Sequence, residues 1–420
     1  MATAPRQFLS DLFDAAVAAA DPLRALRGNL PARPKGRTVV VGAGKGAAQL
    51  AQAFETLWDG PIEGVVVTRY GYGAPCKAIK VLEAAHPVPD AAGIAAAAAL
   101  KDAVRDLESD DLVIALICGG GSSLLPDPPG GLTLNDLQEL NEALLASGEP
   151  ISVMNDIRKC FSEINGGRLA ELAAPASVCT FVVSDVPGDD PGAVASGPTV
   201  IDRPDPAAVR TMIAARGIVL PASCVSFLER LETSPPADAT SLSTQVIASA
   251  ALSLDAAAEL ARARGVNAWV MSDRIEGEAR DVARVHAALA LQTAKTGFPH
   301  DAPVVLLSGG ETTVTLRHKG RGGRNSEFQL ALALAVEGHD GIHALAADTD
   351  GIDGSEDNAG AFVDGSTATQ MRSAKVDPQH HLHGNDAYSA FAAIGDLFVT
   401  GPTGTNVNDF RAILIGTPPD

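Results

Sequence analysis

The chain of 420 residues is too long for one ordinary hydrophobic core, so its length predicts two domains. Its 32 basic and 51 acidic residues give a formal net charge of −19, which argues against nucleic acid or an anionic membrane as a partner. The five cysteines show no C-x-x-C spacing, and the sequence shows neither a signal-peptide pattern nor a long apolar run. We therefore expect a reduced, cytoplasmic protein.

Short apolar runs alternate with alanine-rich helical patterns after a first amphipathic helix. The expected strands are 38–42, 63–68, 112–121 and 179–186, and the helical patterns between them are 47–58, 91–107 and 133–148. Apolar strands that alternate with helices predict a doubly wound, Rossmann-like parallel sheet of the α/β class. In such sheets ligands bind at the carboxyl ends of the strands.

A stretch rich in Pro, Ser and Thr at 230–243 interrupts this alternation and indicates a linker. Strand and helix patterns resume beyond it. The sequence therefore predicts two α/β domains, 1–240 and 241–420.

The first strand leads into the turn G-A-G-K-G-A, which includes Gly44 and Lys45 and opens a helix. One interpretation is the G-x-G-x-x-A turn of a dinucleotide-binding unit. That interpretation requires an acid at the end of the next strand, where this chain has Thr68 and Arg69, so NAD is disfavoured and NADP remains open. The other interpretation is a phosphate site, in which backbone amides, the helix N-terminus and Lys45 contact the anion.

A second glycine loop follows the strand at 112–121. Three glycines and two hydroxyls in succession suit a loop that wraps a phosphate with backbone amides: Gly119, Gly120, Gly121, Ser122 and Ser123. A plain turn is the simpler alternative.

The next segment, 151–173, is the most basic of the chain, and helical spacing places Asn155 and Arg158 on one face. A solvated charged face is the alternative there.

Two acidic loops are candidates for a magnesium site. Asp185 and Asp189 follow the strand at 179–186, and Asp350 lies in a loop with three further aspartates. Mg²⁺ is commonly held by few carboxylates together with substrate phosphate oxygens. A turn network without metal and a helix cap are the alternatives.

Two loops of the C-terminal half carry the remaining candidates. Glu311 ends a strand and glycine turn, and G-R-G-G-R-N delivers Arg324 and Asn325 to the start of a helix. An arginine at a helix N-terminus suits an oxyanion or carboxylate, although a surface arginine loop would look the same. Asn408 lies in a glycine-rich loop near the C-terminus.

These loops occur together, and in the same order, in a known family. The motifs include GAGKGA, CGGGSSLL, SDVPGDDPGAVASGPT, GRGGRNSEFQLALAL and TGPTGTNVND, and the likeness covers about residues 8–418. The chain resembles the type II glycerate kinases, whose second domain is called MOFRL. The resemblance implies ATP- and Mg²⁺-dependent phosphorylation of D-glycerate at its 2-hydroxyl, catalysed by Lys45 and Arg324 in a cleft between the two domains of a monomer or homodimer.

Three positions depart from the family pattern: Cys160 in place of His, Asn165 in place of Lys, and Ser326 in place of Gln. These changes make another hydroxy acid an alternative substrate. A hydroxypyruvate reductase that uses NAD(P)H and a ligand-binding protein without catalysis are the competing functions.

Overall fold

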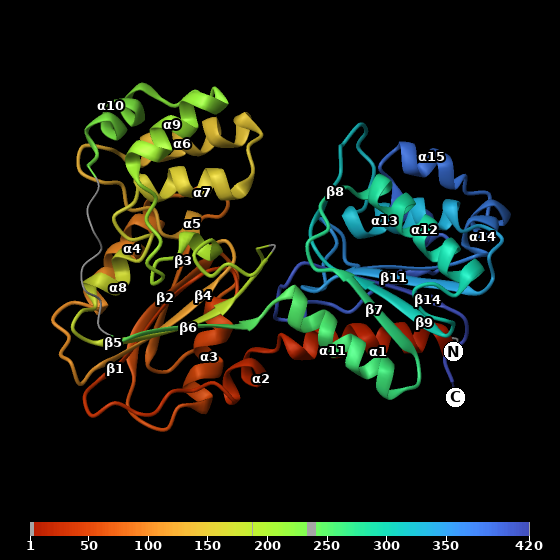
Figure 1. Ribbon diagram of the computed structural model, residues 1–420, viewed down its shortest axis with the longest axis horizontal. Coiled ribbons are helices and arrows are strands. Elements are labelled where there is room, and N and C mark those ends of the chain that lie inside the picture. The colour runs from red at the N-terminus through yellow and green to blue at the C-terminus, as the bar shows by residue number, and fades with distance from the viewer. Residues whose placement is uncertain (1–3, 187, 233–240, 420) are drawn as a thin grey trace. The chain divides into compact units, whose positions relative to one another are not determined.

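The structure is a computed structural model that describes residues 4–186, 188–232 and 241–419 (Figure 1). The chain forms two compact units. The N-terminal unit is Ala25–Ile247, and the C-terminal unit combines the residues up to Arg24 with those from Ala248 onward. No helix among the described residues is long and apolar enough to cross a membrane.

The N-terminal unit is built on a six-stranded sheet. Its strand order is β3 (Ile79–Ala84), β2 (Glu63–Arg69), β1 (Thr38–Ala43), β4 (Leu112–Cys118), β5 (Ser177–Val183) and β6 (Leu242–Ala248). The pairs from β3 to β5 are parallel. This order, with its reversal between β1 and β4, is that of dinucleotide-binding sheets, and it confirms the predicted Rossmann-like fold.

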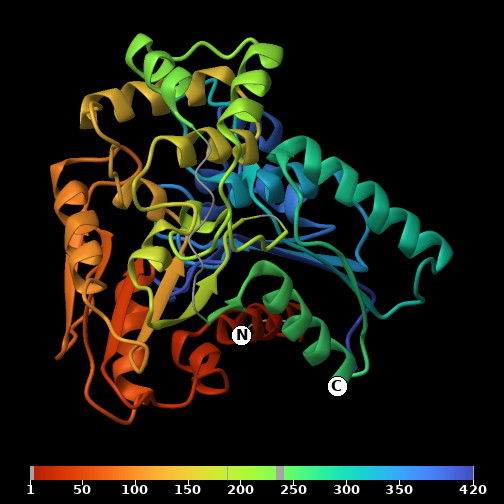
Figure 2. The same ribbon diagram turned by 60° about the vertical axis from the view of Figure 1, so that its left-hand side comes forward.

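Helices cover both faces of this sheet because β-branched strand residues alternate between the faces. Val39 and Val41 share a core with α4 (Ala91–Ala103) and α8 (Arg168–Leu172), whereas α3 (Ala47–Leu57) packs on β1, β2 and β4. Four further helices form a separate apolar core within the same unit (Figure 2): α6 (Leu134–Ser147), α7 (Ile151–Cys160), α9 (Pro206–Arg216) and α10 (Ala222–Arg230).

The C-terminal unit contains a mixed six-stranded sheet. Its order is β13 (Leu397–Phe398), β12 (Gly360–Asp364), β11 (Ile342–Asp348), β14 (Asp409–Ile415), β9 (Val304–Ser308) and β7 (Asn267–Ser272). Only the β7–β9 pair is parallel among the described pairings of this sheet. A small second sheet pairs β8 (Gly277–Glu278) with β10 (Thr312–Thr313).

Two helical layers enclose the mixed sheet (Figure 1). Val304 and Leu306 face a core with α12 (Ala279–Thr296) and α13 (Arg324–Ala335), whereas Val305 and Leu307 face α1 (Ala4–Ala19) and α11 (Ala250–Ala263). The remaining short helices are α2 (Pro22–Arg27), α5 (Gly121–Leu124), α14 (Thr367–Ser373), α15 (Pro378–His383) and α16 (Ala387–Ala392). The two-domain α/β class is therefore confirmed.

The observed units differ from the expected division at residue 240 in two elements. Helix α1 belongs to the C-terminal unit because Phe8 and Phe13 are buried with Leu254 and Phe410. Strand β6, expected to open the second domain, instead completes the first sheet. Periodicity predicts that a helix has an apolar face, but not which sheet that face will cover. Within the expected linker, residues 233–240 lie outside the described residues.

Candidate active site

The two glycine turns of the N-terminal unit lie side by side because they follow the paired strands β1 and β4. The backbone N–H of Lys45 donates to the carbonyl of Gly119 over 2.9 Å. The hydroxyl of Thr68, at the end of β2, donates to the carbonyl of Lys45 over 3.0 Å. The turn that carries Lys45 is thus fixed to both of its neighbouring strands.

The second turn needs glycine because other side chains approach its backbone closely. A Cβ on Gly119 would lie 1.7 Å from Oδ2 of Asp185. A Cβ on Gly120, whose φ is +80°, would lie 2.9 Å from Nε2 of His86 and 3.1 Å from Cγ of Lys45. We call Lys45, His86, Asp185 and the turn Gly119–Ser123 the glycine cluster.

His86 contributes no charge to the glycine cluster at neutral pH. Burial, together with the positive charges of Lys45 and Arg69, lowers its pKa to about 4. Its ring is therefore neutral at pH 7, and Lys45 is the cation beside the turn. Sequence reasoning did not select His86, although it lies in the segment EAAHPVPD, another motif shared with the type II glycerate kinases.

A strained segment supports the same turn. Ala195 and Ser196 have φ values of +52° and +59°, a left-handed conformation that is costly for residues with a side chain. The Ser196 hydroxyl lies 2.8 Å from the hydroxyl of Ser122. The Ser123 hydroxyl donates to the carbonyl of Gly120 over 3.2 Å, so Ser122 and Ser123 both hold the turn in place.

Asn155 and Arg158 lie on the same face of α7, as their spacing predicts. Nη1 of Arg158 donates to Oδ1 of Asn155 over 3.1 Å, and its Nε donates to Asn141 over 2.8 Å. The amide of Asn155 donates to the carbonyl of Ala193 over 3.3 Å. This pair therefore ties α7 to the strained segment, and burial lowers the pKa of Arg158.

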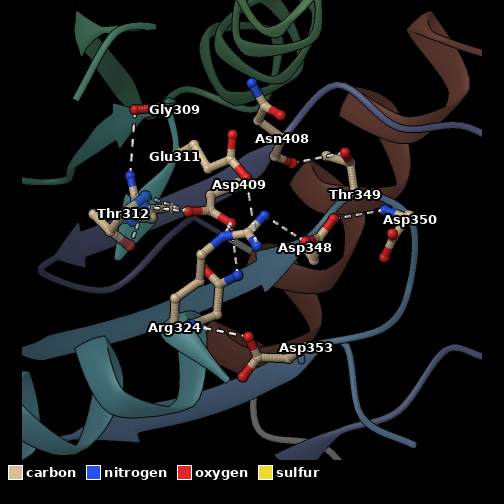
Figure 3. Close-up of polar contacts among 12 residues, drawn as sticks. Gly309, Glu311, Thr312, Arg324, Asp348, Thr349, Asp350, Asp353, Asn408 and Asp409 are labelled. Atoms are coloured by element: carbon tan, nitrogen blue, oxygen red, sulfur yellow. Dashed lines mark hydrogen bonds and ion pairs between the residues drawn. The ribbon is translucent and has the colours of Figure 1, made fainter. Parts of the chain in front are cut away.

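The C-terminal unit places its candidate residues around Arg324, the first residue of α13 (Figure 3). The Arg324 guanidinium donates through Nε to Oδ1 of Asp409 over 2.7 Å and through Nη2 to Oδ2 of Asp348 over 2.6 Å. Its Nη1 lies 3.8 Å from Oε1 of Glu311. Two strand ends, those of β11 and β14, supply the buried carboxylates. We call Arg324, Asp348, Asp409, Glu311 and Arg411 the charge cluster.

Burial makes these ion pairs strong and also costly to break. The side chains of Asp348 and Asp409 are 4% and 0% exposed, whereas Arg324 is 22% exposed. Burial raises the pKa of Asp348, and the Arg324 guanidinium opposes that rise. The three carboxylates in turn hold the pKa of Arg324 above its usual value despite burial. Arg324 is consequently charged and fixed, with part of its surface open to a ligand.

The N-terminus of α13 is already capped. Asp353 accepts from the backbone N–H of Asn325 over 2.9 Å and from that of Ser326 over 2.8 Å. Asn325 is fully buried, and its amide donates to Asp409 over 2.8 Å. Asn325 therefore belongs to the support of Arg324, not to a ligand-facing surface.

A cavity of about 250 Å³ opens beside Arg324. Its other lining residues are Thr312, Val314, Leu316, Gly322, Gly323, Glu327, Gly354, Asn385 and Ala387. Glu327 is paired with Arg280, and Asn385 donates to Glu327 over 2.9 Å, so these buried polar groups are satisfied. A small ligand in this cavity would meet the guanidinium of Arg324 at one wall.

The three aspartates predicted as magnesium ligands differ in their surroundings. Among the described residues no three His, Cys, Asp or Glu side chains form a metal cluster. Mg²⁺ does not need one, since one or two carboxylates plus phosphate oxygens suffice. Asp185 fits this mode because its carboxylate occupies the space that a Cβ on Gly119 would fill. Asp350 accepts hydrogen bonds from Ile352 and Asn406 in its own region, and Asp189 lies in a left-handed turn.

Asn408, predicted to bind substrate or phosphate, lies directly before Asp409 of the charge cluster, whereas sequence reasoning missed the residues that hold Arg324. Asn408 precedes Asp409, and its carbonyl accepts from the Thr349 hydroxyl over 2.7 Å. Asp348, Asp409 and Arg411 were not selected as site residues. A signal for Arg411 existed, because it interrupts the otherwise apolar strand F-R-A-I-L-I.

Comparison with known proteins identifies the family of this chain. Residues 8–229 match a domain of unknown function, DUF4147, and residues 304–409 match the MOFRL family. The D-glycerate 2-kinase of Thermotoga maritima is 37% identical, with 94% of each chain covered. The crystal structure of glycerate kinase from the same organism superposes with a TM-score of 0.89, at 36% identity, over 97% of this chain and 99% of that one.

A second relative carries a different name. A protein of Agrobacterium vitis, provisionally named a hydroxypyruvate reductase, is 52% identical over 98% of this chain and 94% of its own. The only support for a reductase is the name of such relatives, whereas the similarity to the solved glycerate kinase and to the kinase relatives covers nearly the whole chain. The chain belongs to the glycerate kinase family, built from a DUF4147 domain and a MOFRL domain.

Proposed function

We propose that this protein transfers the γ-phosphoryl group of ATP to the 2-hydroxyl of D-glycerate, which gives 2-phosphoglycerate. The observation that carries the proposal is Arg324, a charged guanidinium held by two buried carboxylates at the wall of a small cavity. The family relationship supplies the reaction class, since the Thermotoga maritima relative is named a D-glycerate 2-kinase.

Phosphoryl transfer depends mainly on positioning and on neutralising charge. Lys45 is the cation of the glycine cluster and would offset negative charge on the transferring phosphoryl group. Arg324 presents a forked donor that suits the carboxylate of the hydroxy acid or the phosphoryl oxygens. Mg²⁺, when bound, would neutralise phosphate charge, and Asp185 is the residue we propose to hold it, with Asp189 and Asp350 as further candidates.

Each of the three departures from the family pattern has a packing or hydrogen-bonding role within its own unit, which supports D-glycerate as the substrate. Cys160 is buried in the apolar core of α6, α7, α9 and α10. Ser326 donates to Asp353 over 2.5 Å within the cap of α13. Asn165 is buried beside Ser162, whose hydroxyl accepts from its backbone N–H over 3.1 Å. None of the three lines the cavity beside Arg324.

A cytoplasmic location is part of the same proposal. All five cysteines are free, as expected for a protein of a reducing compartment.

Coupled ADP formation with Mg-ATP tests the proposal against D-glycerate, L-glycerate and a panel of four-carbon sugar acids. Turnover on D-glycerate that Lys45→Ala abolishes is the expected result. Turnover only on a larger acid would show that D-glycerate is not the substrate. The absence of turnover on every acid would refute the proposed kinase activity. NADPH oxidation with hydroxypyruvate is the parallel assay. It is expected to be silent, since the kinase relatives and the solved glycerate kinase match nearly the whole chain.

A further inference from the structure

Arg411 is the largest fully buried side chain among the described residues, and the proposed reaction does not yet use it. It lies on the central strand β14, where the residues beside it in sequence, Phe410 and Ala412, are apolar. Burying a charged group of this size is costly unless the charge is paired. Its contacts therefore deserve a functional explanation.

One contact of Arg411 connects it to Arg324. Its Nη2 is paired with Oδ2 of Asp409 and donates to the Thr312 hydroxyl over 3.1 Å, and its Nη1 donates to the carbonyl of Gly309 over 3.3 Å. The other oxygen of Asp409 accepts from Arg324. One carboxylate thus bridges two guanidinium groups.

The packing of Arg411 is not optimal for stability alone. Its Nε is buried without an acceptor among the described residues, and its guanidinium carbon lies 5.2 Å from the centre of the Phe328 ring. An apolar residue would avoid both the desolvation of the charge and this unmet donor. Stability by itself gives no reason for an arginine at this position.

Charge balance does give a reason. Among the buried groups of the charge cluster, Arg324 and Arg411 match Asp348 and Asp409 in number, whereas Glu311 is 57% exposed and screened by solvent. If Arg411 were apolar, the two buried carboxylates would outnumber Arg324, and an incoming anion would be repelled. We propose that Arg411 is a positioning residue: it neutralises Asp409 and fixes its orientation, so that the buried carboxylates do not outweigh the positive charge of Arg324, which stays available to an anionic ligand.

This inference rests on the proposed function but can be tested apart from it. The variants are Arg411→Met, Arg411→Lys, and the charge-balanced pair Asp409→Asn with Arg411→Met. We expect Arg411→Met to raise KM for the anion that Arg324 holds, D-glycerate or ATP, at least tenfold with a smaller change in kcat. Arg411→Lys and the charge-balanced pair should both recover to within about fivefold of the wild type, because each restores the balance.

Calorimetric titration with inorganic tripolyphosphate supplies a readout that needs no catalysis. Arg411→Met is expected to weaken binding to the same extent as Arg324→Met, and the Arg324→Met/Arg411→Met pair no further, because Arg411 acts through Arg324. If the wild type phosphorylates no hydroxy acid, the proposed function fails, and this titration still decides the role of Arg411.

The matched control is another arginine of the same unit. Arg6 pairs with the buried Asp396 over 2.6 Å and lies 5.4 Å from the centre of the Phe362 ring. Arg6→Met should lower stability but change neither KM nor the tripolyphosphate Kd.

The proposal is wrong if folded Arg411→Met binds anions as the wild type does, or if the charge-balanced pair binds no better than Arg411→Met. If Arg411→Met does not fold, a loss greater than tenfold in the folded charge-balanced pair also overturns it.

Discussion

The glycine cluster and the charge cluster prepare two units for anions by opposite means. In the glycine cluster the backbone of Gly120 lies close to the side chain of Lys45, and the neighbouring His86 is neutral and adds no charge. The second surrounds Arg324 with buried carboxylates and a second arginine. Lys45 is half-buried, so solvent helps to stabilise its charge, whereas a buried cation needs partners that fix both its charge and its direction. We expect mutations in the two clusters to separate activity from stability.

The largest expected effect is a contrast between Lys45→Met and Arg324→Met. Both should lower kcat by on the order of 10³-fold, since each removes a cation aimed at developing charge. Arg324→Met should also cost about 3–5 kcal/mol of stability, because Asp348 loses its partner while buried. Lys45→Met should stay within about 0.5 kcal/mol of the wild type. Urea unfolding and steady-state kinetics measure both quantities, and equal stability losses would contradict the contrast.

The next effect tests the close approach in the glycine cluster. Gly119→Ala should cost about 1–3 kcal/mol and reduce activity at least tenfold, because the new Cβ would displace Asp185. Gly130→Ala is the matched control in the same loop region, since nothing lies within 4 Å of its Cβ position. Thermal unfolding and turnover of both variants check this prediction, and a fully active Gly119→Ala would exclude a role for the Asp185 approach.

A third prediction concerns acid sensitivity of the C-terminal unit. Burial lowers the pKa of His286 from 6.5 to about 4, and the nearby Arg411 charge adds to the effect. The ring donates to the Val282 carbonyl, so its other nitrogen accepts from the Ser308 hydroxyl at 2.9 Å. Because the unfolded chain binds the proton more readily, the stabilising contribution is complete above pH 6.5 and is lost as the pH falls toward 4.

We expect this histidine to account for about 2 kcal/mol of lost stability between pH 7 and pH 5. Urea titrations at the two pH values should show a loss smaller by that amount in His286→Gln. His300→Gln, at an exposed histidine, should keep the wild-type slope. An unchanged slope in His286→Gln would show that other groups cause the acid sensitivity.

The smallest effect concerns the cap of α13. Asp353→Asn should cost about 1 kcal/mol, because it removes a negative charge from a buried helix N-terminus. Asp377→Asn, at the exposed cap of α15, should cost less than half as much, because asparagine caps equally well in water. The difference in thermal unfolding temperature measures both, and equal costs would mean that burial does not strengthen the Asp353 cap.

The sequence predicted several features of the site because they depend on local spacing. Glycine turns after apolar strands identified Gly44 and Gly119–Ser123, and the i, i+3 spacing identified the Asn155–Arg158 contact. Arg324 was predicted at a helix N-terminus and lies there. Asn325 was predicted to face a ligand, but the structure buries it beneath Arg324, since only packing decides which side of a helix start is covered.

By itself, then, the sequence determined the alternating strands and helices, the glycine turns and the family motifs, all of which are encoded within a few neighbouring residues. The tertiary structure decided three further features: the helix α1 on the second sheet, His86 beside Gly120, and the bridge from Arg411 through Asp409 to Arg324. Each joins segments far apart in the chain. Hydrophobic periodicity indicates which face of a segment is buried but not which other segment covers that face. These contacts can therefore be identified only from the tertiary structure.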